Sequence, residues 1–267
     1  MDDRTFEYLL LQLKNLLGVD LQGYKMQQMR RRLTSFVDNR SGGDTMRFIR
    51  SLGDDEKMLR SLRDMLTINV TEFFRDTDQW NQLRESVMPE LIADGKRVNI
   101  WSAGCSHGQE PYSLAMILDQ LGGLDRARLL ATDFDRGVLK RARAGGPYSE
   151  PEVAGVSESE LEQYFTSAED GYTVTDQLRR KIRFDELNLL YDSFSSGFDL
   201  IVCRNVTIYF EAEVKTRLFA NFAAALKPGG ILFIGATEAL LGDDAQGFKR
   251  MGGNFYRWQS EAASKAA

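Results

Sequence analysis

The segment from Ala103 to Tyr112 carries the residues best suited to bind a ligand. It follows a short apolar run and contains Gly104 and Gly108, which permit a tight turn and a close approach of a ligand to the backbone. Glu110 then places a carboxylate at the start of a helix. The two glycines do not form the G-x-G-x-x-G pattern of dinucleotide sites, and a carboxylate there would repel a pyrophosphate. The segment therefore favours a cationic ligand, although Glu110 is also explained as a complement to the helix dipole.

Two further polar residues follow runs that read as strands. Asp133 ends the run 129–132, where an acidic residue can accept hydrogen bonds from both ribose hydroxyls; it is also a candidate helix N-cap. Asn188 follows the run 181–184, and its amide can pair with an adenine edge or form a turn. A nucleoside with a sulfonium and an ammonium group, S-adenosylmethionine, fits this set better than NAD does.

The elements that must position these residues alternate between strands and helices. Such alternation predicts right-handed βαβ units and a doubly wound α/β sheet, with ligands at the carboxyl ends of the strands. Residues 227–230, Lys-Pro-Gly-Gly, predict a break before the last strand. The predicted strands are 98–101, 129–132, 198–203 and 231–234, and the predicted helices between them are 111–121, 135–143 and 211–226.

Residues 1–75 have helical periodicity and predict a small all-α domain, in which Asp44 caps a short helix carrying Met46, Ile49 and Leu52. Residues 76–267 form the α/β domain. The stretch of about 147–185 fits its rhythm poorly and is predicted to be an inserted subdomain.

The composition excludes several classes of protein. The 267 residues are 43% hydrophobic and 27% charged, ordinary values for a globular chain. No apolar run reaches the ~20 residues that span a bilayer, and the start, Met1-Asp2-Asp3, lacks signal-peptide features. The two cysteines fit a reducing cytosol. We expect a cytoplasmic protein without membrane insertion, and a net charge of −5 argues against a nucleic-acid binder.

With these motifs in place, the sequence resembles the CheR family of chemotaxis receptor methyltransferases over nearly its whole length. Three positions depart from the family pattern: His107 and Gln109 replace Ser or Thr and Glu, and Thr207 replaces an aliphatic residue. The matching segments, in chain order, are 67–75, 101–105, 110–115, 131–133, 188–190, 203–206, 208–210, 227–230 and 237–238.

The resemblance implies a class I (Rossmann-like) methyltransferase domain, an all-helical N-terminal domain and an inserted antiparallel β-subdomain. It implies S-adenosyl-L-methionine as cofactor, S-adenosyl-L-homocysteine as product, and no metal. Tyr209 and Arg75 are the implied catalytic residues. The cofactor-binding residues expected from the resemblance and from the glycine turn are Asn69, Thr71, Arg75, Gly104, Glu110, Asp133, Asn188, Leu189, Arg204 and Asn205.

The chemistry fits transfer to a glutamate. A glutamate carboxylate, with a pKa of about 4.3, is ionised at neutral pH and attacks a sulfonium methyl group without a general base. The single histidine, His107, is accordingly interpreted as a loop residue near the methionyl group. Arg75, Arg204 and the Tyr209 hydroxyl are candidates to orient carboxylates, and Tyr209 is alternatively a packing residue. No Asn/Asp-Pro-Pro-Tyr motif follows Cys203, which favours an oxygen acceptor.

Residues 25–40 have a local charge of +4, and we expect Arg30, Arg31 and Arg32 to contact the acidic methylation helices of chemoreceptors. The alternative is a solvated helix face. The segment 166–172 is short with one glycine, so we expect no tether to a receptor's C-terminal pentapeptide. A monomer is expected.

Three other functions stay open from the sequence. The first is a methyltransferase of the same fold with another acceptor, such as RNA or an unrelated protein. The second is a non-catalytic S-adenosylmethionine-binding module. The third, an NAD-dependent oxidoreductase, is disfavoured by the two-glycine turn and by Glu110.

Overall fold

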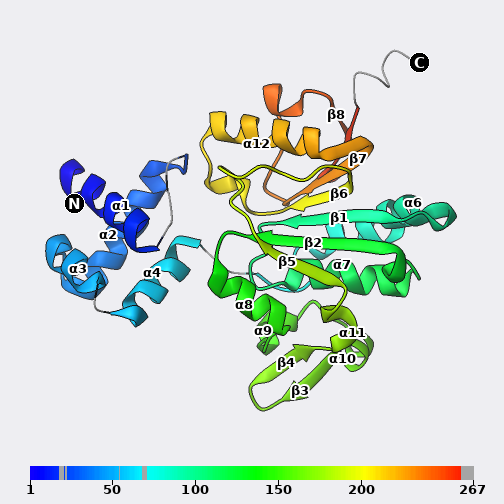
Figure 1. Ribbon diagram of the computed structural model, residues 1–267, viewed down its shortest axis with the longest axis horizontal. Coiled ribbons are helices and arrows are strands. Elements are labelled where there is room, and N and C mark those ends of the chain that lie inside the picture. Colours follow the sequence, from blue (N-terminus) through cyan, green and yellow to red (C-terminus); the bar gives the residue numbers. More distant parts are fainter. Residues whose placement is uncertain (18–20, 22, 54, 68–70, 260–267) are drawn as a thin grey trace. The chain divides into compact units, whose positions relative to one another are not determined.

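The computed structural model describes residues 1–17, 21, 23–53, 55–67 and 71–259 (Figure 1). The chain divides into two compact units. The first comprises residues 1–69 and 209–214, and the second comprises residues 70–208 and 215–267. The division therefore falls a few residues before the boundary near 75 that the sequence predicts, and the first unit takes in a short segment from far along the chain.

In the described part of the first unit there are four helices, and each buries an apolar stripe. Asp44 caps the third helix as predicted, because its carboxylate accepts a hydrogen bond from the Arg47 N–H at 2.9 Å. Of the three residues named on the predicted helix, Ile49 and Leu52 are buried and Met46 is 41% exposed; Phe48 is buried beside them. The helices are α1 Asp3–Leu17, α2 Met26–Ser41, α3 Thr45–Leu52 and α4 Glu56–Thr67.

Segment 209–214 joins this unit through backbone and ring contacts that the sequence does not reveal. The Lys25 N–H donates to the Tyr209 carbonyl at 2.9 Å. Tyr24 and Phe210 form an antiparallel bridge, and their rings meet edge to face with centroids 5.1 Å apart.

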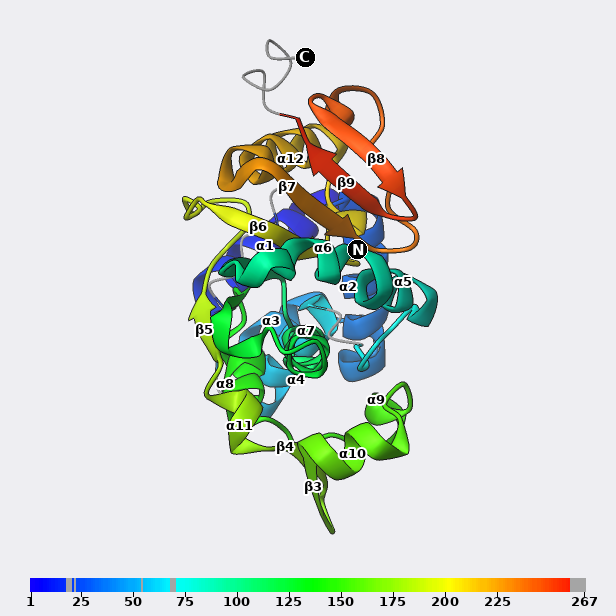
Figure 2. The ribbon, with the colours of Figure 1, turned by 90° about the vertical axis from the view of Figure 1, so that its right-hand side faces the viewer.

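The second unit is built on a seven-stranded sheet with the order β5-β2-β1-β6-β7-β9-β8 (Figures 1 and 2). The first five strands of this order are parallel, and β9 and β8 add an antiparallel edge. This arrangement confirms the predicted doubly wound α/β fold. The strands are β1 Val98–Ala103, β2 Ala127–Asp133, β5 Ile182–Glu186, β6 Phe198–Cys203, β7 Leu226–Ile234, β8 Phe248–Gly252 and β9 Phe255–Trp258.

Helices cover both faces of this sheet. The connections β1-α7-β2 and β6-α12-β7 run outward from the centre in opposite directions, so right-handed crossovers place α7 and α12 on opposite faces (Figures 1 and 2). The helices are α5 Thr77–Gln82, α6 Met88–Ile92, α7 Gln109–Gln120, α8 Arg136–Ala144 and α12 Ala212–Ala225, with a π-helical turn at Leu83–Val87 and 3-10 turns at Ala93–Gly95, Leu124–Arg126, Thr207–Tyr209 and Gly242–Ala245.

The predicted break at 227–230 is wrong, because β7 continues through it. Leu226 pairs with Phe198 and Ile231 with Leu200, so the register shifts within these residues. Gly229 takes a φ of 81° there. The Lys-Pro-Gly-Gly sequence thus forms an irregularity inside the strand rather than a turn before it.

An inserted segment follows α8 and carries a two-stranded antiparallel hairpin. The predicted insert of about 147–185 extends too far, because β5 begins at Ile182 and pairs with β2 in the central sheet. The elements of the insert are α9 Glu150–Val153, α10 Glu158–Tyr164, β3 Phe165–Ala168, β4 Gly171–Val174 and α11 Asp176–Arg179.

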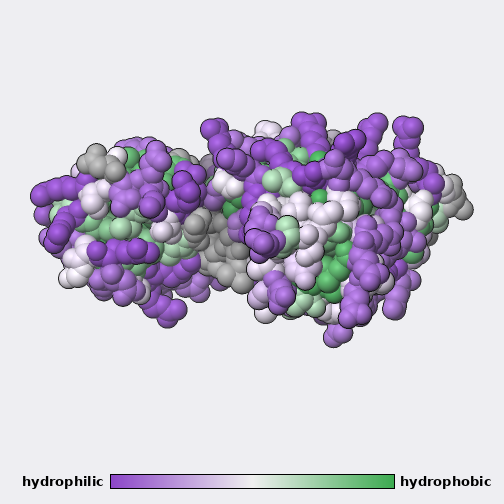
Figure 3. Space-filling model, turned by 90° about the horizontal axis from the view of Figure 1, so that it is seen from below, coloured by the Kyte–Doolittle hydropathy of each residue, from purple (hydrophilic) through white to green (hydrophobic). Residues whose placement is uncertain are grey.

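The surface carries many polar side chains. On the face shown in Figure 3, hydrophilic residues surround smaller apolar areas. Among the residues that the structure describes, no helix has the length and apolar character needed to cross a membrane.

Candidate cofactor site at the ends of the parallel strands

The turn after β1 lies against the end of β2. The Gly104 N–H donates to the Thr132 carbonyl at 2.8 Å. Gly104 has a φ of 84°, and a Cβ added there would lie 2.6 Å from a methyl group of Val206. A side chain at this position would be strained and would clash. The glycine is therefore needed to let the turn after β1 approach Val206, in the loop after β6.

Asp133 ends β2 and is 8% exposed. Its two oxygens accept hydrogen bonds from the backbone N–H groups of Ser106 at 2.9 Å and Asp135 at 3.0 Å. Burial raises the pKa of Asp133 to about 6 despite these donors. Asp133 does not cap α8; Asp135 does, accepting from the Gly137 N–H at 2.7 Å. Since a carboxylate offers about four acceptor positions, Asp133 retains capacity for a ligand's hydroxyl groups.

Glu110 lies in the first turn of α7, and its side chain is 12% exposed. The Ser102 hydroxyl donates to one of its oxygens at 2.8 Å, and the Arg204 guanidinium is 4.0 Å from the other. Burial raises the pKa of Glu110 to about 7, against the lowering effects of Arg204 and Ser102. An additional cation beside Glu110 would favour its ionised form. The site therefore suits the ammonium group of a ligand, while the helix-dipole interpretation remains compatible with the same position.

Arg204 follows β6 and has only 3% of its side chain exposed. Its guanidinium lies over the rings of Trp80 and Phe233, at 5.3 and 4.9 Å from their centroids. One of its nitrogens donates to three acceptors: the Arg75 carbonyl at 2.7 Å, the Asp76 carboxylate at 2.8 Å and the Gln79 side chain at 3.1 Å. Arg204 thus holds the segment before α5 against the end of the sheet, and burial lowers its pKa.

Glu238 is a buried residue of this region that the sequence did not single out as part of the site. One oxygen accepts from the N–H groups of Asn205 at 2.8 Å and Gly235 at 2.7 Å. The other accepts from the N–H and hydroxyl of Thr207 at 2.9 and 2.6 Å. Asn205 has a φ of 60°, so Glu238 holds a left-handed turn directly after Arg204. The signals in the sequence were an acidic residue shortly after an apolar strand and the resemblance of segment 237–238 to the family pattern.

Asn188 takes up the turn-forming role that the sequence left open. Its side-chain oxygen accepts from the Leu190 N–H at 2.9 Å, and its own N–H donates to the Asp192 carboxylate at 2.7 Å. The preceding residue, Leu187, donates to the Asp133 carbonyl at 3.0 Å, which keeps this turn beside the end of β2. Leu189 is 9% exposed.

The remaining predicted residues are distributed over both units. Thr71 is half-buried, and Arg75 lies between Phe74 and Asp76, two residues with positive φ. Asn69 lies outside the described residues. Tyr209 belongs to the first unit. The second unit alone therefore brings together the ends of β1, β2, β6 and β7 with Gly104, Glu110, Asp133, Arg204 and Asn205.

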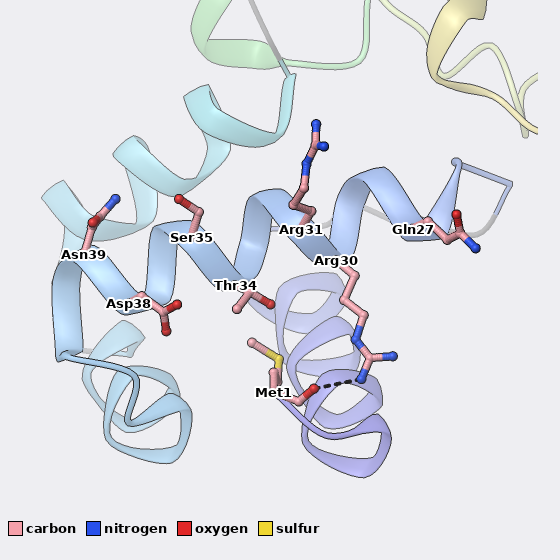
Figure 4. Close-up of a pocket in the computed structure, with 8 residues that line it drawn as sticks. All are labelled: Met1, Gln27, Arg30, Arg31, Thr34, Ser35, Asp38 and Asn39. Carbon is pink, nitrogen blue, oxygen red and sulfur yellow. Dashed lines mark hydrogen bonds between the residues drawn. The ribbon is translucent and has the colours of Figure 1, made fainter.

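The three arginines of α2 differ in their surroundings. Arg30 donates to the Asp3 carboxylate at 2.6 Å and to the Met1 carbonyl at 2.8 Å. Arg32 donates to the Met65 carbonyl, and burial lowers its pKa. Arg31 is exposed. In Figure 4, Arg30 points toward Met1 and Arg31 projects from another side of α2. A groove of about 680 Å³ runs along the helix and is lined by Met1, Gln27, Arg30, Arg31, Thr34, Ser35, Asp38 and Asn39.

Comparison with known proteins places this arrangement in a family. Residues 69–256 match the model of the CheR methyltransferase SAM-binding domain. A chemotaxis protein methyltransferase of Listeria monocytogenes is 38% identical over 95% of this chain and 97% of its own length. Chemotaxis protein methyltransferase 1 of Pseudomonas aeruginosa is 37% identical over 88% of this chain and 90% of its own. The chain belongs to the CheR methyltransferase family and is an S-adenosylmethionine-dependent methyltransferase.

Proposed function

We propose that this protein transfers the methyl group of S-adenosylmethionine to glutamate carboxylates of chemoreceptors, forming glutamate methyl esters and S-adenosylhomocysteine. The observation that carries the proposal is the similarity to chemotaxis protein methyltransferases along nearly the full length of both chains. Its biological role would be sensory adaptation in chemotaxis.

The residues at the strand ends fit the cofactor. We propose that the Glu110 carboxylate binds the ammonium group and that Asp133 accepts the ribose hydroxyls. Asp133 is buried and the Glu110 side chain is only 12% exposed; both have raised pKa values, and both keep acceptor capacity beyond their hydrogen bonds within the protein. The bound cofactor supplies a methyl group on a sulfonium. Asn69, Thr71, Arg75, Gly104, Asn188, Leu189, Arg204 and Asn205 are proposed to complete the site.

The acceptor needs no general base. A glutamate with a pKa of about 4.3 arrives ionised, so the protein has to align it and exclude water. The His107 carbonyl accepts from the Tyr148 hydroxyl, and a ring nitrogen of His107 is 3.5 Å from the Ser106 hydroxyl. We propose that Arg75 and Tyr209 orient the acceptor carboxylate.

Receptor docking is proposed to depend most on Arg31. Arg30 and Arg32 already donate hydrogen bonds within the first unit, whereas Arg31 is exposed and lines the groove along α2. An acidic receptor helix would be attracted to that side chain, which would chiefly raise the association rate.

We further propose that the protein acts as a cytoplasmic monomer, binds no nucleic acid and uses no pentapeptide tether. Only two residues separate β3 from β4, which supports the last point.

The chemical test is the lability of the product. We expect the protein, incubated with methyl-labelled cofactor and receptor-bearing membranes, to label receptors and to release volatile methanol after mild base. Label that survives base would indicate methylated nitrogen and would contradict glutamate esterification. Absence of any transfer, together with tight binding of S-adenosylhomocysteine, would support a non-catalytic binding module.

The docking proposal is tested by a charge reversal with a matched control. Arg31→Glu is expected to slow receptor methylation by ~10-fold at low salt, with a smaller effect at high salt. Arg50→Glu changes another exposed arginine, on α3, and should leave the rate near that of the wild type. Equal rates for the two variants would refute the role of Arg31. The tether is tested separately by calorimetry with a receptor C-terminal pentapeptide, for which we expect no measurable binding.

A further inference from the structure

Two helices of the insert are attached to α7 by glutamates with the same double role. Glu152 of α9 and Glu160 of α10 each close a capping box with the serine that precedes the helix. In each case one oxygen accepts from this serine, and the other accepts from a glutamine side chain of α7 at 2.8 Å. Each also pairs with an arginine of the surrounding domain: Arg141 with Glu152 and Arg84 with Glu160.

The two attachment points lie at opposite ends of α7. Gln109, bonded to Glu152, is the first residue of the helix and is completely buried. Gln120, bonded to Glu160, is the last residue, ~16 Å further along the helix axis. Gln109 directly precedes Glu110, whereas Gln120 lies away from the strand ends. The insert therefore holds the cofactor turn with one glutamate and the far end of the same helix with the other.

A second contact from the insert reaches the same turn. The Tyr148 hydroxyl donates to the His107 carbonyl at 2.7 Å. Tyr148 is completely buried, and the Arg141 guanidinium lies 5.1 Å from its ring centroid. The turn between β1 and α7 is thus held from the insert at His107 and at Gln109.

We infer that Glu152 is a positioning residue for cofactor binding: through Gln109 it sets the first turn of α7 and so the direction of the Glu110 carboxylate. Glu110 accepts one hydrogen bond from the described protein residues, so its orientation depends mainly on the backbone that carries it. The inference rests on the proposed role of Glu110 toward the ammonium group. It also implies that a molecule which displaces the insert would weaken cofactor binding.

The matched pair Glu152→Ala and Glu160→Ala tests this. Each substitution removes one capping box, one arginine pair and one glutamine bond, so comparable losses of thermal stability are expected. Binding of S-adenosylhomocysteine, measured by calorimetry below the melting temperatures, should weaken by ~10-fold for Glu152→Ala and by less than ~2-fold for Glu160→Ala. Tyr148→Phe, which removes only the hydroxyl, should also weaken binding.

An exchanged pair separates positioning from general destabilisation. Gln109→Glu places two carboxylates in contact in a buried place and should bind the ligand poorly. In the double variant Gln109→Glu/Glu152→Gln, the amide oxygen at position 152 can point toward Ser149 and Arg141. The amide nitrogen at 152 can then donate a hydrogen bond to the carboxylate at position 109. We therefore expect this double variant to recover most of the wild-type affinity.

Three results would overturn the inference: wild-type affinity in Glu152→Ala, equal losses in Glu152→Ala and Glu160→Ala, or an exchanged pair that binds no better than Gln109→Glu. Calorimetry with S-adenosylhomocysteine requires no receptor, so these results are independent of whether the acceptor is a glutamate. Failure of wild-type binding itself would instead count against the proposed cofactor site.

Discussion

Glu110 and Glu238 are two largely buried glutamates near the same edge of the sheet, and their surroundings differ. Glu238 accepts four hydrogen bonds, three of them from backbone N–H groups. Glu110 accepts one, from the Ser102 hydroxyl, with Arg204 at 4.0 Å. The acceptor positions of Glu238 are filled by the protein, whereas most of those of Glu110 are not. Residue type and burial are similar, so the number of donors distinguishes a structural carboxylate from one with capacity for a ligand.

Because of this difference, we expect loss of the Glu238 charge to reduce folding stability and loss of the Glu110 charge to reduce ligand affinity. Removing the Glu238 carboxylate leaves backbone donors of the turns after β6 and β7 without partners, which costs folding free energy. Removing the Glu110 charge affects few hydrogen-bond donors of the protein. Burial also already opposes the ionisation of Glu110. A ligand cation would be the main partner lost.

The largest effect is expected for Glu238→Gln. The amide has one oxygen in place of two and brings its own donors among N–H groups, so we expect the free energy of unfolding to fall by about 3 kcal/mol. Urea denaturation measures this directly. A loss below about 1 kcal/mol would show that the turn does not depend on the carboxylate, and it would remove the contrast with Glu110.

Glu110→Gln should act on the ligand instead. We expect the affinity for S-adenosylhomocysteine to fall by ~10-fold or more, since a charge-assisted hydrogen bond contributes about 1.5–3 kcal/mol. The free protein should not be destabilised at pH 8. The pKa of Glu110 rises from an ordinary 4.5 to about 7 on folding, so between these values the folded state holds a proton that the unfolded state releases. Stability therefore falls as the pH rises through this window, and the substitution removes that loss above pH 7.

The control for this variant is its melting curve at pH 5 and pH 8. The stabilising effect of the substitution should be present at pH 8 and should shrink toward pH 5, where Glu110 is protonated in the folded protein. A variant that loses stability and affinity together would instead place Glu110 with Glu238 as a structural carboxylate.

A third prediction concerns the pH dependence of ligand affinity. An ammonium group binds the ionised form of Glu110, so affinity should fall by up to ~10-fold per pH unit as the pH drops below about 7. Protonation of Asp133 should add to the decline below about 6. Calorimetry between pH 5.5 and 8.5 gives the dependence of affinity on pH. In Glu110→Gln the decline in affinity that begins below about pH 7 should be absent. A flat profile in the wild type would mean that Glu110 stays ionised without the ligand.

Local patterns in the sequence were sufficient to predict the α/β architecture. They were not sufficient to predict which glutamate has its acceptor positions filled by the protein. The run 198–203 matches β6 at both ends, and the run 98–101 is extended by two residues in β1. The cap at Asp44 depends on a neighbour three residues away and was likewise predicted. Such features need only local geometry.

Features that depend on distant contacts could not be read in this way. The four donors to Glu238 come from segments about thirty residues away and from its own turn. Segment 209–214 joins the first unit because it meets Tyr24 and Lys25, far away in the sequence. Charge alone grouped Arg30 with Arg31 and Arg32, although two of the three donate hydrogen bonds within the first unit. The partner of a polar side chain is decided by tertiary structure, which periodicity does not encode.

The smallest expected effect comes from Thr207, where the family more often has an aliphatic residue. Its hydroxyl donates to Glu238 at 2.6 Å, the shortest of the four hydrogen bonds to that carboxylate. Thr207→Val keeps the shape and removes the donor, so we expect a loss of about 1 kcal/mol in unfolding free energy and little change in ligand affinity. Thr207→Ser keeps the hydroxyl and should lose less. If Thr207→Val were neutral, the remaining three backbone donors would be enough for Glu238, and the number of donors needed to make a buried carboxylate structural would be three.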